Sequence, residues 1–196
     1  MVVNGDYFYC VISDGAGSSD FAKEAAWCTV NTAADFCYNN GNAFFTDSRE
    51  QISRNMVFDI QQVLYEQAKK LNSDLSQMMS TLVLLCIDTK SMQYTTVHIG
   101  DGLIAKYNNT QFKVLSYPHN GKTNSFTYFI CDENITENIR ISNKTFNIYD
   151  SFIICSDGAY EKTDNVSNIP MLYDKADKQI GVNDDITYCI FNIQIL

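Results

Sequence analysis

Beyond residue 80 the chain is a series of short apolar runs separated by turn residues, and this pattern limits what it can fold into. Runs of this length and composition are typical of β-strands, and the Asp-Gly and Asn-Asn pairs between them are typical of hairpin turns. Closely spaced strands of this kind pair as antiparallel sheets. The predicted strands are 81–87, 94–99, 103–107, 112–115, 126–131, 139–141, 152–155 and 186–196.

The first 80 residues have a different periodicity. Residues 6–13 form a predicted strand, and apolar side chains then recur at helical spacing in two segments, 21–38 and 47–71. Asp47 is the predicted N-cap of the second helix, because Asp accepts hydrogen bonds from the free N–H groups of a first turn. Trp27, in the middle of the first helix, is predicted to lie in the core.

The order of these elements predicts the fold class. One strand, two helices, many antiparallel strands, a short helix near 170–175 and a last strand place the chain in the α+β class. A chain of 196 residues without a Gly/Ser linker is predicted to form a single domain, residues 1–196.

Composition excludes several function classes. The net charge of −9 argues against binding to nucleic acid or an anionic membrane, because basic patches supply that affinity. No apolar run is long enough to span a bilayer, and the first residues do not resemble a signal peptide, so we expect a cytoplasmic protein. The seven cysteines form no Cys-x-x-Cys motif and are predicted to be buried free thiols.

The tetrapeptide Ser-Asp-Gly-Ala occurs twice, at 13–16 and 156–159, each time directly after an apolar strand. Asp101-Gly102 follows another strand, Asp184 precedes the last strand, and Asp6 begins the first. Any one Asp-Gly pair is explained as turn chemistry, because Asp caps locally and Gly accepts a positive φ.

Several strand-end carboxylates together favour a metal site, because a turn accepts Asn in place of Asp whereas a divalent cation needs the charge. Hard cations such as Mg²⁺ and Mn²⁺ take carboxylate and carbonyl oxygens as ligands. A glycine directly after the aspartate, as at Gly15, lets a backbone carbonyl approach the ion. Two such ions can acidify a shared water and clamp a phosphoryl group.

In this order the motifs resemble those of metal-dependent serine/threonine phosphatases of type 2C, and the bacterial branch of that family is the most similar. The resemblance covers nearly the whole chain and rests on Ser13-Asp14-Gly15-Ala16-Gly17, Gly100-Asp101-Gly102, Pro118-His119-Asn120-Gly121, Asn124–Phe129, Ser156-Asp157-Gly158 and Asp184-Asp185-Ile186-Thr187. It implies an α-β-β-α sandwich of two mainly antiparallel sheets, with Mg²⁺ or Mn²⁺ held between them.

The resemblance also implies a role for each residue. Asp14 would bridge two metal ions, with the carbonyl of Gly15 on one of them, and Asp157 and Asp184 would complete the ligands of the first ion. Asp6 matches the second acidic position of the family's N-terminal motif, and Asp101 and Glu161 match positions that hold a third, weaker ion. A bridging hydroxide would attack the phosphorus of phosphoserine or phosphothreonine in a phosphoprotein, opposing a serine/threonine kinase.

The chain departs from the family pattern at its N-terminal motif. Gly5 replaces an acidic or amide residue, and Ala16 replaces a histidine that is the presumed general acid in many members. The arginine that the family uses near the N-terminus to bind phosphate is absent. These departures leave open a pseudophosphatase that acts as a binding or regulatory module. A phosphatase for a small phosphorylated metabolite is a third, weaker alternative.

The two histidines have different predicted environments. His98 alternates with Val97 and Ile99, so the favoured interpretation places it hydrogen-bonded on the opposite sheet face rather than at the site. His119 lies in a loop that could reach a substrate cleft.

Overall fold

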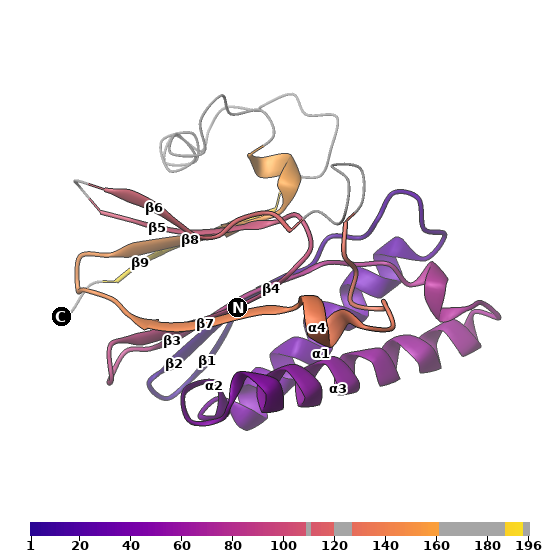
Figure 1. Cartoon of the computed structure of the whole chain (residues 1–196), viewed down its shortest axis with the longest axis horizontal. Helices are drawn as coiled ribbons and strands as arrows, with labels where there is room; N and C mark the ends of the chain where they lie inside the picture. Colours follow the sequence, from indigo (N-terminus) through magenta and orange to yellow (C-terminus); the bar gives the residue numbers. More distant parts are fainter. Residues whose placement is uncertain (109–110, 120–126, 161–186, 194–196) are drawn as a thin grey trace.

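The computed structural model describes residues 1–108, 111–119, 127–160 and 187–193. Within these residues the strands form two antiparallel sheets that face each other (Figure 1). The five-stranded sheet has the order β1 (Val2–Asn4), β2 (Tyr7–Ile12), β3 (Leu82–Asp88), β4 (Gln93–Ile99), β7 (Arg140–Thr145). The four-stranded sheet has the order β6 (Phe112–Ser116), β5 (Leu103–Tyr107), β8 (Ser151–Cys155), β9 (Tyr188–Asn192). The predicted α+β class with two antiparallel sheets is confirmed.

The space between the sheets is filled by aromatic and branched side chains. Phe152 of β8 is fully buried and makes edge-on contacts with Tyr94 and Phe146, at centroid distances of 5.1 and 5.7 Å. β3 is buried at every position, because one of its faces meets the second sheet and the other meets helices. This double burial explains why 82–87 is a continuous apolar run rather than an alternating one.

Two long helices, α1 (Ala22–Asn40) and α3 (Arg49–Lys70), lie on the outer face of the five-stranded sheet (Figure 1). The buried residues of α1 recur at helical spacing, and Trp27 falls on the opposite side of the helix, where it is 69% exposed. The prediction that Trp27 lies in the core was therefore wrong. None of the helices in the described residues has the length and apolar character that crossing a membrane requires.

Shorter elements connect the layers. They are α2 (Ala43–Thr46), the 3₁₀ turn η1 (Leu75–Gln77), α4 (Ile135–Asn138) and the 3₁₀ turn η2 (Asp157–Ala159). The prediction of a strand at 126–131 was wrong for its described part. There the backbone bonds are irregular: the Ile130 N–H donates to the carbonyl of Ser80, and the Phe129 N–H donates to the Asp132 carboxylate. The helix predicted near 170–175 lies outside the described residues.

All seven cysteines lie in the described residues and are free thiols, as predicted, and five of them are buried.

The N-terminus of α3 is capped by Ser48 rather than by Asp47. The Ser48 hydroxyl accepts from the Gln51 N–H, and the Gln51 side chain accepts from the Ser48 N–H, which makes a capping box. Asp47 instead ends α2, with its N–H donating to the Ala43 carbonyl. The sequence alone did not indicate which of these two residues caps α3, because Asp and Ser are both good N-caps.

This assignment predicts different costs for two adjacent substitutions. We expect Ser48→Ala to lower the free energy of unfolding by about 1 kcal/mol, because it removes one acceptor of the capping box. Asp47→Ala should change it by no more than about 0.5 kcal/mol, as for an exposed surface position. Urea denaturation of the two variants measures both values, and a larger loss in Asp47→Ala would contradict the assignment.

Candidate metal centre

Asp14 is held at the end of β2 by backbone bonds to the start of β3. The Asp14 N–H donates to Thr81 Oγ1 at 3.0 Å, and the Thr81 N–H donates to the Asp14 carbonyl at 2.8 Å. The Ser13 hydroxyl donates to the Thr81 carbonyl at 2.6 Å. These bonds of the Asp14 main chain fix the position of the partly buried aspartate.

Asp101 and Asp157 are brought together by the pairing of β5 with β8. Leu103 lies opposite Cys155 in that pair, so the turn before β5 sits beside the residues that follow β8. The Tyr160 hydroxyl donates to the Asp101 carbonyl, and the Thr127 hydroxyl donates to Asp101 Oδ2 at 2.7 Å. Asp157 accepts the Gly158 N–H on Oδ1 at 2.8 Å.

Asp14, Asp101 and Asp157 line one cavity of about 180 Å³. The other described lining residues are Gly15, Ala16, Gly17, Thr81 and Phe129, so none of the described residues in the lining is basic. The three carboxylates bring negative charge to the lining of one cavity, and a bound cation would be favoured there. Their oxygen donors suit Mg²⁺ or Mn²⁺.

These carboxylates do not make a complete metal site by themselves. Within the described residues, no group of three His, Cys, Asp or Glu side chains is close enough to hold an ion. Asp184 and Glu161, which the resemblance assigns to the same ions, lie outside the described residues. The donor chemistry therefore fits a metal, and the ligand set remains a prediction.

Two glycines allow the close approach of chain segments around the cavity. A Cβ on Gly15 would lie 2.3 Å from the Ala22 carbonyl oxygen, so the loop after β2 can pass the start of α1 only with glycine there. Gly100 has a φ of +105°, and a Cβ there would lie 2.5 Å from the Thr81 side chain. Glycine at these positions is explained by packing as well as by access to an ion.

Asp6 does not reach this cavity. It lies in the turn between β1 and β2, and its carbonyl accepts from the Thr89 N–H at the far end of β3. β2 is six residues long, which places its two ends roughly 20 Å apart. The structure therefore does not bring Asp6, which was matched to the family's second acidic position, to this cavity, because an extended strand separates it from Asp14.

Thr81, Thr127 and Phe129 belong to the cavity wall or its support and were not identified from the sequence. Thr81 carried a weak signal, as a polar residue that opens a buried strand. Thr127 and Phe129 lie in the segment Asn124–Phe129 that contributes to the family resemblance, but neither was assigned a role, because only the fold brings that segment beside Asp101.

His98 lies between the sheets, away from the acidic cavity. It is fully buried, and its Nδ1 is 2.7 Å from the Ser116 hydroxyl, which confirms its predicted place on the opposite sheet face. Burial lowers its pKa to about 3, with repulsion from Arg140 and His119 adding to the effect. His119 donates its N–H to the Gly100 carbonyl, and burial lowers the pKa of its side chain too.

The lowered pKa of His98 predicts a loss of stability in acid. The unfolded chain takes up a proton near pH 6.5, whereas the folded chain resists protonation down to about pH 3. This contribution is therefore complete above pH 6.5 and declines as the pH falls, by up to about 1.4 kcal/mol per pH unit. Urea denaturation between pH 7.5 and 4.5 should show a shallower pH dependence for His98→Gln than for the wild type, and equal slopes would contradict this.

The chain matches the protein phosphatase 2C family over residues 1–179 and belongs to that family. No curated protein matches it in sequence. The predicted resemblance to type 2C phosphatases is therefore confirmed.

Several solved structures share the fold. A Stage II sporulation E family protein from Thermanaerovibrio acidaminovorans is 16% identical, over 96% of this chain and 97% of that one, with a TM-score of 0.65. A bacterial serine phosphatase is 15% identical, over 95% and 86%, with a TM-score of 0.68. RsbX, solved with magnesium, is 17% identical, over 97% and 83%, with a TM-score of 0.60. At these identities the similarity shows the fold alone.

Proposed function

We propose that this protein is a Mg²⁺- or Mn²⁺-dependent phosphatase that removes phosphate from phosphoserine or phosphothreonine in proteins, opposing a serine/threonine kinase. The observation that carries the proposal is the cavity of about 180 Å³ that Asp14, Asp101 and Asp157 line. Membership of the protein phosphatase 2C family and the magnesium in the RsbX structure support it.

In this proposal Asp14, Asp157 and the carbonyl of Gly15 hold two ions together with Asp184, while Asp101 and Glu161 hold a third. Bound there, the ions would supply a water acidic enough to ionise at neutral pH and positive charge for the phosphoryl oxygens. Thr81 keeps Asp14 in position through main-chain bonds, and Thr127 and Tyr160 orient Asp101. Ala16 offers no proton to a leaving group, so that proton comes from water.

The test is a phosphatase assay on the full chain. With Mn²⁺ or Mg²⁺ we expect turnover of p-nitrophenyl phosphate and of a phosphoserine peptide, and we expect chelator to abolish it. Absence of turnover, together with no Mn²⁺ binding by calorimetry, would instead support the pseudophosphatase that Gly5 and Ala16 leave open. Turnover of small phosphorylated metabolites but not of the peptide would contradict the protein substrate.

A further inference from the structure

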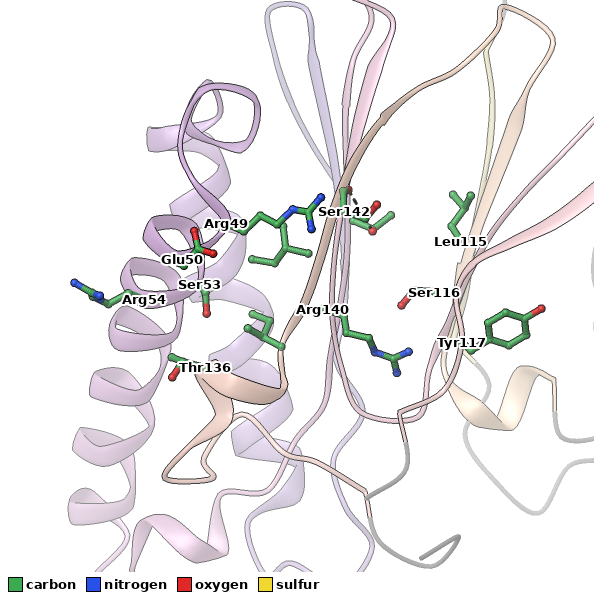
Figure 2. Close-up of a pocket in the computed structure, with 13 residues that line it drawn as sticks. Arg49, Glu50, Ser53, Arg54, Leu115, Ser116, Tyr117, Thr136, Arg140 and Ser142 are labelled. Carbon is green, nitrogen blue, oxygen red and sulfur yellow. Dashed lines mark hydrogen bonds between the residues drawn. The ribbon is translucent and has the colours of Figure 1, made fainter. Parts of the chain in front are cut away.

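All three arginines of the chain line a single cavity of about 720 Å³. Arg49 and Arg54 come from α3, and Arg140 comes from β7, so the fold brings together residues that are distant in sequence. The cavity lies at the edge of the sandwich, where the edge strands β7 and β6 leave the space between the sheets accessible (Figure 2). Among the described residues it shares no lining side chain with the acidic cavity around Asp14.

Arg140 extends from β7 toward Ser116 and Tyr117, at the end of β6 (Figure 2). Its Nε and Nη2 atoms are shielded from solvent and have no hydrogen-bond partner in the described part of the chain. The ion pair found in that part joins Lys106 to Asp150, so no described carboxylate neutralises Arg140. Buried guanidinium donors without acceptors are costly, and a ligand that accepts from them would remove that cost.

The neighbouring groups make the cavity a site for an anion. Glu50 is the only acidic side chain among its described lining residues, against three arginines, although the whole chain carries a net charge of −9. Ser53 is 5% exposed and its hydroxyl has no partner within the described residues, so it is available as a further donor. Burial also lowers the pKa of Arg140, as expected for a cation without a counter-ion.

The use of arginine indicates the chemistry of the ligand. A guanidinium donates two parallel hydrogen bonds to the oxygens of a phosphate or a carboxylate, and it is preferred over lysine where that geometry matters. Figure 2 shows Arg49 reaching from α3 toward β7, whereas Arg54 points away from the sheets and adds only longer-range charge. Arg140 and Arg49 are therefore the arginines with side chains directed toward the sheet edge.

The volume of the cavity and its remaining walls indicate a ligand larger than a free ion. Leu115, Tyr117, Ile139 and Ile141 provide an apolar surface beside the arginines. Cavities of about 300–1,000 Å³ with an apolar lining and a few polar groups are typical sites for small organic molecules.

We propose that this cavity binds a small molecule that carries a phosphate or carboxylate group, with the anionic oxygens on Arg140 and Arg49 and the remainder against the apolar wall. This site is separate from the proposed metal centre and does not depend on phosphatase activity.

The test is calorimetric titration of the full chain in chelator, with inorganic phosphate, citrate and adenosine monophosphate as probes. We expect the wild type to bind phosphate or citrate, and adenosine monophosphate more tightly than phosphate, because its base and sugar use the apolar wall. Arg140→Met should weaken binding by about 10- to 100-fold, the value of a lost hydrogen bond to a charged group. Lys90→Met, an exposed lysine in the β3–β4 turn, removes the same charge elsewhere and should have no effect.

Two further variants test the same site if Arg140→Met does not fold and distinguish it from the metal centre. If Arg140→Met does not fold, Arg49→Met changes an exposed helix position and should weaken binding at least several-fold. Asp14→Asn should bind the probes as the wild type does, which separates this site from the metal centre. The proposal is overturned if no probe binds, if adenosine monophosphate binds no better than phosphate, or if Asp14→Asn abolishes binding that Arg140→Met leaves intact.

Discussion

Asp14→Asn is expected to lower metal-dependent hydrolysis of p-nitrophenyl phosphate by roughly 100- to 1,000-fold, as for loss of a group that stabilises transition-state charge. The substitution removes the negative charge that would hold the ions and keeps the shape of the side chain. The fold should survive, because the bonds between residue 14 and Thr81 use the main chain of residue 14. Steady-state rates with Mn²⁺, beside circular dichroism of the same sample, measure both effects.

Asp6→Asn is the matched control for this prediction. It removes the same charge, but from the opposite end of β2, where the carboxylate cannot reach the cavity. We expect its activity to equal that of the wild type. Comparable losses in Asp6→Asn and Asp14→Asn would show that the placement of the site is wrong.

Asp157→Asn extends the test to the second copy of the repeated motif. If Asp14 and Asp157 hold the same ions, either substitution removes the shared centre, and the double variant should be no slower than the slower single variant. Multiplicative losses in the double variant would indicate that the two carboxylates act independently.

Phe152→Ala is expected to lower the free energy of unfolding by about 3–5 kcal/mol, which is a large part of the stability of a typical domain. Phe152 is fully buried at the centre of the inter-sheet core, between Tyr94 and Phe146. Its loss leaves a cavity that the surrounding side chains fill only in part, because a close-packed core relaxes little around a deleted ring. Urea denaturation, analysed at a constant m-value, gives the difference.

Tyr149→Ala is the control for this core substitution. Tyr149 precedes β8 by only two residues but is 79% exposed, so its removal should change stability by no more than about 0.5 kcal/mol. A loss below about 1.5 kcal/mol for Phe152→Ala would mean that the two sheets are not packed as described.

Much of the fold could be predicted from local pattern. The apolar runs at 82–87 and 152–155 are strands that are buried on both faces, as a continuous apolar pattern between turn residues predicts. The errors arose where local pattern is ambiguous. The apolar segment 127–131 makes irregular contacts with Ser80 instead of pairing as a strand, and Trp27 is exposed although it is apolar.

The candidate site could be predicted in part. The sequence determined by itself that Asp14 and Asp157 each end a buried strand and that Asp101 follows one, because strand ends depend on neighbouring residues alone. Only the tertiary structure decided which of these aspartates line the same cavity. The register of β2 on β3 and of β5 on β8 brings three of them to one cavity and leaves Asp6 at the opposite end.

The cavity lined by the three arginines could not be predicted from the sequence at all. The sequence contains three arginines with no motif around them, and nothing local relates Arg49 and Arg54 on a helix to Arg140 on a strand. They line one cavity because β7 pairs with β4 at the sheet edge and α3 packs beside it, and both are long-range contacts. Local residue chemistry determined the elements and their ends, whereas sheet order and register, which depend on the whole core, decided which side chains share a site.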